Sequence, residues 1–227
     1  MTLPFSARTR VERRYVRPPE PLHFPESEEM PETGLHLVLC THLFLLVQDF
    51  VGERGAVGSD QFVYWDPLDP RKSLAPDLIV RMGAPSGVFP SWKTWERGAP
   101  HVGVEIVSDF DAARGTWSDK LARYRGAGID EVVRFDPSDR EHPLRLWDRF
   151  EGDLVERVLE GENALLSDAL GAYWCVREDP KIGPMLGLAL DPFGERLVPS
   201  PEERERAEKE AALARVAELE AELRRRG

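Results

Sequence analysis

Cysteine is scarce in this sequence of 227 residues, which contains only Cys40 and Cys175. Two cysteines so far apart offer neither a CxxC motif nor the paired bridges of a secreted disulfide scaffold, so the sequence predicts a reducing, cytoplasmic setting. Long apolar runs are scarce too. The longest one, 35–47, is interrupted by His36 and His42 and falls short of the roughly 18 apolar residues that predict a membrane span. We therefore expect a core helix there and no membrane partner.

Positive charge is in deficit. The chain has 30 Lys and Arg against 41 Asp and Glu, which gives a net charge of −11. This balance excludes a protein that coats nucleic acid non-specifically, because phosphate contacts require clustered Lys and Arg. The sequence also lacks a helix-turn-helix or zinc-finger pattern that would read DNA. An enzyme that cuts nucleic acid is still compatible with this charge, since a carboxylate-rich metal site itself lowers the total.

The apolar content is enough for one substantial core. The hydrophobic fraction is 41% and there are six Trp, so the length fits one domain with extensions. We expect an extended N-terminal arm at 1–31, which is rich in Arg and Pro, then a folded α/β domain at 32–199 and a C-terminal helix at 200–227. The arm is interpreted as a solvated tail, and an arm that contacts phosphate is the less favoured alternative.

The C-terminal segment has the composition of a long helix, with Glu, Arg, Ala and Leu dominating. Its apolar residues recur at spacings of 4, 3 and 4, at Ala212, Val216, Leu219 and Leu223. This seam covers about two heptads, and such a pattern is typical of a short coiled coil. We therefore predict a projecting helix that can associate with a second copy, which favours a homodimer.

Signals for helices and strands alternate along the central part of the chain. Thr33 suits the N-cap of a helix over 34–53. Strands are predicted at 61–65, 78–82, 102–107 and 131–135, a helix at 116–125, and a hairpin over 144–158. Residues 161–199 contain only short apolar pieces between Gly and Pro. The alternation predicts an α/β fold.

One strand carries an acid where apolar residues would be expected. Glu105 lies in the middle of Val102–Val107, and strand alternation places Gly103 and Glu105 on one face. An ionised carboxylate in an apolar setting needs a partner charge or a metal ion. Pairing with an Arg would explain an isolated Glu equally well. The apolar residues on both sides of Glu105 favour a functional site.

A second acid and a lysine complete a candidate site. Asp77 follows Pro76 at the start of the strand 78–82. If that strand pairs with the Glu105 strand, the two carboxylates can converge on one hard cation such as Mg²⁺, which prefers oxygen ligands. Lys120, on the predicted helix, would then lie near an attacked phosphate. Tyr124 is four residues further along the same helical face.

These residues, in this order, resemble a known protein family. The motifs are Pro76-Asp77, Val104-Glu105-Ile106-Val107-Ser108, Asp119-Lys120-Leu121 with Tyr124, Gly128-Ile129, and Phe135-Asp136-Pro137. They are similar to the Uma-two family, restriction-endonuclease-like proteins of the PD-(D/E)XK nuclease superfamily, over roughly residues 32–195. The resemblance implies a restriction-endonuclease-like α/β core with a mixed central β-sheet of about four strands flanked by helices. It also implies hydrolysis of phosphodiester bonds that depends on Mg²⁺ or Mn²⁺.

The resemblance assigns roles to three residues. Asp77 matches the first acid of the superfamily motif and Glu105 the second, so both are predicted to be catalytic and to bind the metal. The superfamily lysine would stand two residues after Glu105, where this chain has Val107. In the Uma-two pattern a helix-borne lysine replaces it, and Lys120 fits that place as the third catalytic residue.

Other matches are weaker. His36, Asp60 and Tyr124 are candidate auxiliary residues, although a packed, hydrogen-bonded helix histidine explains His36 equally well. The family usually continues its Glu strand with Ser-Pro, whereas here Ser108 is followed by Asp109. That departure gives the chain an unusually charged loop after the strand.

The leading interpretation is a metal-dependent endonuclease acting on DNA. The basic residues predicted to line its substrate groove are Lys93, Arg114 and Arg123, together with Arg71 and Lys72. A competing interpretation is a catalytically silent, nuclease-like scaffold that acts as a protein-interaction module through its C-terminal helix. A third is a metal hydrolase that acts on a smaller phosphate ester. The presence of all three catalytic residue types favours the first.

Overall fold

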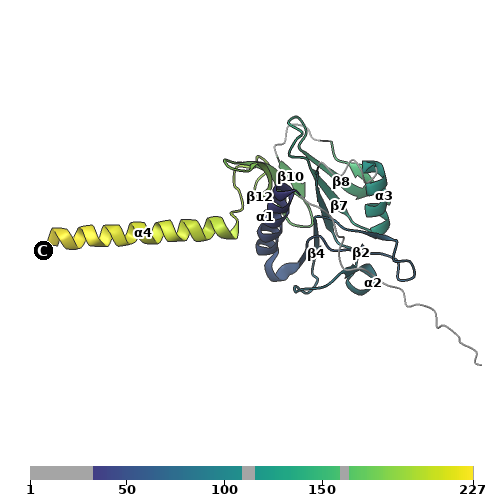
Figure 1. The fold of residues 1–227 in the computed structure, drawn as a ribbon, viewed down its shortest axis with the longest axis horizontal. Coiled ribbons are helices and arrows are strands. Elements are labelled where there is room, and N and C mark those ends of the chain that lie inside the picture. The colour runs from purple at the N-terminus through teal and green to yellow at the C-terminus, as the bar shows by residue number, and fades with distance from the viewer. Residues whose placement is uncertain (1–32, 109–115, 159–163, 227) are drawn as a thin grey trace, which may run out of the picture.

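The computed structural model of the chain describes residues 33–108, 116–158 and 164–226 (Figure 1). It is an α/β structure with a central mixed sheet, helices on its two faces and a long C-terminal helix that projects away from the rest. The predicted fold class is confirmed in these respects. The predicted arm at 1–31 lies outside the described residues.

The central sheet has six strands in the order β1-β4-β6-β7-β8-β9. These are β1 (Gly55–Gly58), β4 (Leu78–Met82), β6 (Val102–Ile106), β7 (Glu131–Phe135), β8 (Leu144–Phe150) and β9 (Asp153–Glu156). Only the β6–β7 pair is parallel; the other neighbours in this sheet are antiparallel. The parallel pair follows from the connection, because the chain leaves β6 and returns to β7 through the helix α3 (Trp117–Ala127).

The edge strand β1 was not predicted, and the sheet has six strands where about four were expected. Two of the four residues of β1 are glycine, a residue that is depleted in strands and gives no periodic signal. Close packing against the neighbouring strand requires glycine at position 55. A Cβ there would lie 2.6 Å from the backbone oxygen of Arg81 on the paired strand β4.

One face of the central sheet is covered by α1 (Gly34–Val51) and by a second sheet. As predicted, Thr33 caps α1, with its hydroxyl accepting from the His36 amide at 3.1 Å. A short 3₁₀ turn, Gly52–Arg54, follows. The second sheet consists of β10 (Ala164–Ser167), β11 (Ala172–Asp179) and β12 (Gly183–Ala189). These three layers share one hydrophobic core.

The segment Gly34–Arg54 is long and apolar enough to cross a membrane, with a mean hydropathy of 1.6. In this structure one side of it packs against the central sheet. The buried residues on that side include Leu39, Leu43, Leu46 and Val47. This is the packing expected of a core helix.

The opposite face of the sheet is covered by α3 and by short elements. These are β2 (Val63–Tyr64), β3 (Ser73–Leu74), β5 (Trp92–Lys93) and the single turn α2 (Thr94–Arg97). A capping box begins α3: the Thr116 hydroxyl accepts from the Asp119 amide, and the Asp119 carboxylate accepts from the Thr116 amide, each at 3.2 Å. Gly128 ends it with a φ of 79°, a left-handed conformation that favours glycine.

A buried carboxyl group joins the two main sheets. Glu131, at the start of β7, is 4% exposed and accepts a 2.9 Å hydrogen bond from the indole of Trp174 on β11. Burial raises the pKa of Glu131 from 4.5 to about 7, while hydrogen bonds from Trp174 and Ser167 lower it. A raised folded-state pKa means that folding favours the protonated acid.

We therefore expect the free energy of unfolding to fall as the pH rises from 5 to 8, because the unfolded chain releases the Glu131 proton at its ordinary pKa of 4.5 while the folded protein retains it up to a pKa of about 7. Replacing it with Gln keeps the hydrogen-bond acceptor and removes the ionisation. The difference in stability between the wild type and Glu131→Gln should change by about 2 kcal/mol over that range, in favour of the variant at high pH. Urea unfolding at both pH values measures this; parallel pH profiles of the two proteins would contradict it.

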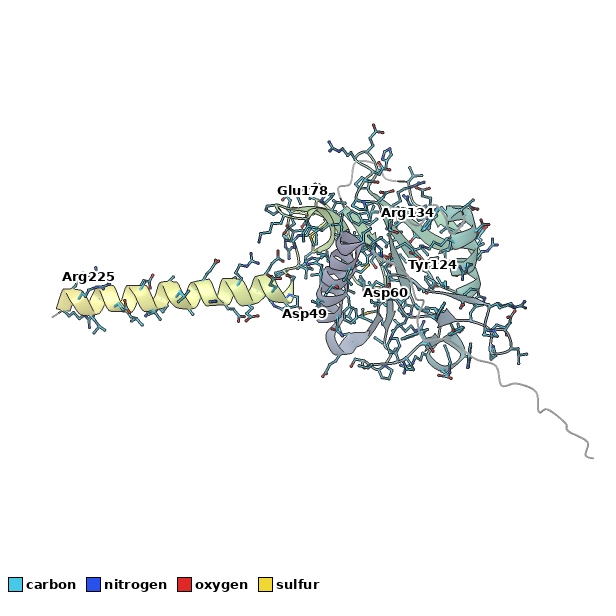
Figure 2. All side chains as sticks on the ribbon, viewed as in Figure 1. Asp49, Asp60, Tyr124, Arg134, Glu178 and Arg225 are labelled. Carbon is cyan, nitrogen blue, oxygen red and sulfur yellow. The ribbon has the colours of Figure 1, made fainter. Side chains whose placement is uncertain are left out.

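The helix α4 (Pro201–Arg226) is 26 residues long and contains no buried residue. Its first turn is attached to the body by two ion pairs, Arg177 with Glu203 and Arg204 with Asp49, the latter at 2.6 Å. Figure 2 shows Asp49 beside the base of this helix. Beyond that base, the apolar residues of the predicted seam are exposed, among them Val216, Leu219 and Leu223, together with Leu213.

Candidate active site

The register of the central sheet brings the two predicted acids to neighbouring strands. β4 and β6 are antiparallel neighbours, with Leu78 opposite Val104. Asp77 immediately precedes β4, and its Oδ2 accepts a 2.5 Å hydrogen bond from the amide of Ile106 on β6. Because Ile106 follows Glu105, the two carboxylates belong to one small region of the sheet. Asp77 is 8% exposed and Glu105 is 4% exposed.

Glu105 points to the face covered by α3. Its Oε2 lies 2.6 Å from the ammonium group of Lys120, and its Oε1 accepts a hydrogen bond from the phenol of Tyr124. Lys120 and Tyr124 are four residues apart, so one side of α3 presents both groups to the same carboxylate. The helix reaches the sheet closely because β6 has Gly103 beneath it, where a Cβ would lie 2.5 Å from Cε1 of Tyr124.

The site holds more negative charge than its surroundings stabilise. Burial raises the pKa of Glu105 from 4.5 to about 7, the ion pair with Lys120 opposes this shift, and the negative charge of Asp77 adds to it. Burial, together with the negative charge of Glu105, also raises the pKa of Tyr124 well above its ordinary value. Tyr124 therefore remains a neutral hydrogen-bond donor. A further positive charge close to Glu105 would stabilise its ionised form.

The second oxygen of Asp77 meets residues of α1. Asp77 Oδ1 lies 3.2 Å from Nε2 of His36, and Sγ of Cys40 lies 3.4 Å from the same nitrogen. The potential ligand atoms of His36, Cys40 and Asp77 all lie within 4.8 Å of one another, and all three residues are buried. This group can bind a metal ion. Asp77 thus contacts both α1 and the backbone of the Glu105 strand β6.

The donor set fits a hard divalent cation. Each of the four carboxylate oxygens of Asp77 and Glu105 makes one contact described above, and a carboxylate oxygen has a second lone pair that a metal can use. Oxygen ligands are those that Mg²⁺ and Mn²⁺ prefer. The raised pKa of Glu105 supports the same conclusion, since a bound cation offsets the charge that burial disfavours.

Asp60 lies in the loop that supports the backbone of Asp77. Its amide donates to the carbonyl of Pro76 at 3.2 Å, and the hydroxyl of the preceding Ser59 donates to the carbonyl of Asp77 at 2.7 Å. Asp60 has a positive φ of 52°, a left-handed conformation that Asp tolerates better than most residues. Asp60 therefore has a structural role beside Asp77. An auxiliary role in chemistry stays a prediction.

No described contact joins the predicted substrate-binding residues Lys93 and Arg123 to Glu105. Arg123 donates to the carbonyl of Ser73 on β3 at 3.0 Å, and Lys93 forms a 3.5 Å ion pair with Glu96. Arg114 lies outside the described residues. A substrate role for these three residues stays a prediction.

Two residues near the site were not singled out from the sequence. Cys40 is one helical turn after His36, and that spacing of four on a predicted helix could have indicated it. Arg134 on β7 is the register partner of Glu105, so the two share a face. It donates to Asp136 at 2.9 Å, and its guanidinium lies 5.6 Å from the ring centre of Trp117. Figure 2 shows Arg134 and Tyr124 on the α3 side of the sheet.

Fold and site together define an α/β protein with a buried centre of two carboxylates, a lysine and a tyrosine. No protein-family model matches the chain, and no curated protein is significantly similar to it. Among solved structures it is similar to one from Anabaena variabilis described as "a putative nuclease belonging to DUF820". The two are 13% identical with a TM-score of 0.43, and the match covers 61% of this chain and 74% of that one. Membership of the Uma-two family stays a prediction.

Proposed function

We propose that this protein is a metal-dependent nuclease that hydrolyses phosphodiester bonds in DNA. The observation that carries the proposal is the 2.6 Å ion pair between Lys120 and the buried Glu105, on the strand next to Asp77. Two carboxylates can hold the divalent metal for phosphodiester hydrolysis, and a lysine can stabilise the charge that develops on the phosphate. The ordered motifs around them, which resemble the Uma-two pattern, support DNA as the substrate class.

Each residue has a distinct role in this proposal. Asp77 and Glu105 would hold Mg²⁺ or Mn²⁺, and a metal bound there lowers the pKa of a water molecule and offsets charge on the phosphoryl group. Lys120 directs its positive charge to a phosphate oxygen or orients the attacking water. Its side chain is 27% exposed, compared with 5% for that of Glu105, which suits a group that meets an incoming substrate. Tyr124 fixes the orientation of Glu105.

Cleavage should depend strictly on a divalent cation. With supercoiled plasmid as substrate, we expect nicking by the wild type in Mg²⁺ or Mn²⁺, none in EDTA, and recovery when Mg²⁺ is added in excess. Without the metal, Lys120 alone cannot lower the pKa of the attacking water. Agarose gels measure the conversion. Isothermal titration with Mg²⁺ provides a second measurement. If the wild type neither nicks plasmid nor binds the metal, the proposal is wrong.

A second candidate function is that of a scaffold that acts through α4. The observation that favours it is the exposure of Leu213, Val216, Leu219 and Leu223 on a helix with no buried residue. A second copy of the chain is the partner that the short heptad pattern favours. The plasmid experiment separates the candidates. A scaffold has no metal-dependent cleavage, and its self-association is lost when 200–227 is removed.

A further inference from the structure

The side chains of His36, Cys40 and Asp77 converge where α1 meets the start of β4. The proposed nuclease chemistry does not use this arrangement. His36 and Cys40 lie one turn apart on α1, and both are buried. The nitrogen Nε2 of His36 lies 3.2 Å from Asp77 Oδ1 and 3.4 Å from Cys40 Sγ. The three potential ligand atoms lie within 4.8 Å of one another.

Only one of these two contacts can be a strong hydrogen bond of a neutral imidazole. A neutral imidazole nitrogen is either a donor or an acceptor. If Nε2 carries the proton and donates to Asp77, the Cys40 thiol cannot donate to it, and its sulfur is only a weak second acceptor of the same N–H. If Nε2 instead accepts from the thiol, it carries no proton. Its lone pair then faces a lone pair of the Asp77 carboxylate, and that contact is repulsive. A nucleophilic Cys-His-Asp triad is excluded as well, because such a triad uses two different ring nitrogens.

A tetrahedral metal ion explains both contacts. Typical zinc bond lengths are about 2.0–2.1 Å to nitrogen, 2.3 Å to sulfur and 2.0–2.2 Å to oxygen. At tetrahedral angles these lengths separate nitrogen from oxygen by about 3.4 Å and nitrogen from sulfur by about 3.6 Å. The observed separations are 3.2 Å and 3.4 Å. Two of the three ligand separations therefore lie close to zinc-binding values, and all three ligand atoms lie within 4.8 Å of one another.

We propose that His36, Cys40 and Asp77 form a binding site for Zn²⁺ or a similar transition-metal ion. A thiolate and an imidazole select such ions over Mg²⁺, which takes oxygen ligands. Three protein ligands leave a fourth position for water or another small ligand. The site shares Asp77 with the proposed nuclease centre, so Zn²⁺ and Mg²⁺ compete for that carboxylate. The proposal does not require the protein to be an active nuclease.

Cobalt is the probe for this site, because Co²⁺ substitutes for Zn²⁺ and absorbs light. Metal-free, full-length protein titrated with Co²⁺ should bind one equivalent and show a thiolate-to-cobalt charge-transfer band with the strong visible bands of a tetrahedral ion. Cys40→Ser, which preserves the size of the side chain, should lose the charge-transfer band. Cys175→Ser is the matched control: Cys175 is the other buried cysteine, lies on β11 and is not in the described ligand group. It should retain the band.

Zinc added in excess should displace the bound cobalt and bleach the spectrum. X-ray absorption of the zinc-loaded wild type gives a test that does not depend on any variant, and it should find one sulfur among lighter ligands. A wild type without the charge-transfer band, a band that survives Cys40→Ser, or a zinc shell without sulfur would each overturn the proposal. None of these readouts involves cleavage, so a failed plasmid assay and a failed zinc site are distinguishable.

Discussion

Replacing Asp77 with Asn should reduce metal-dependent plasmid cleavage by at least about 10²-fold, the effect typical of losing one group that stabilises a charged transition state. Asn has nearly the same shape, and its side-chain oxygen can still accept from the amide of Ile106. The negative charge is what disappears. Among the described residues, the proposed Mg²⁺ site has two carboxylates, so removal of one should also weaken Mg²⁺ binding measured by titration calorimetry.

Asp148→Asn is the matched control for this variant. Asp148 lies on β8, in register with Glu131 at the end of β7 that is remote from Glu105. It forms a 2.7 Å ion pair with Arg157. Its loss can affect stability without touching the proposed metal ligands, and cleavage by folded protein should be near that of the wild type. If Asp77→Asn retained a tenth or more of the wild-type rate, Asp77 would not be a ligand of the catalytic metal.

Adding one methyl group at Gly103 should have the largest effect on stability among the glycine-to-alanine changes near the site. A Cβ there meets Cε1 of Tyr124 at 2.5 Å and Cδ1 of Tyr124 at 3.2 Å. Tyr124 is fully buried and bonded to Glu105, so it cannot move aside without breaking that contact. Overpacking of this kind typically costs about 1–3 kcal/mol. Urea unfolding of Gly103→Ala measures the loss.

Two comparisons separate a clash from a general glycine effect. Gly34→Ala is the control, since nothing lies within 4 Å of a Cβ at that position, and it should change the stability little. In a Tyr124→Ala background the cost of Gly103→Ala should shrink, because the atoms that it meets are gone. Equal costs of Gly103→Ala in both backgrounds would show that Tyr124 is not the cause.

Local sequence signals predicted the elements that build the site. The cap at Thr33, the apolar strands around Asp77 and Glu105, and the helix carrying Lys120 and Tyr124 all correspond to elements of the structure. Alternation along β6 also predicted that Gly103 and Glu105 face the same way. These features are local because they depend on residues a few positions apart.

The features that the sequence did not reveal depend on distant pairings. The strand predicted at 61–65 contains β2, but its parallel pairing with β5 was not predicted, because β5 is only two residues long and so short a segment carries no periodicity. The second sheet, β10–β12, was interpreted only as short apolar pieces. The convergence of His36, Cys40 and Asp77 was missed for the same reason. It requires knowing that α1 packs over the start of β4.

The exposure of α4 determines which substitutions this part of the protein can tolerate during evolution. At about 1.5 Å per residue, its 26 residues extend roughly 39 Å. Since none of its side chains is buried, substitutions along it are constrained by helix formation and by the surface it presents, and not by the packing of the core. Beyond its ion-paired first turn, the helix can therefore be exchanged for another while the folded body stays the same. That property makes it a natural attachment point for fusing or redirecting the domain.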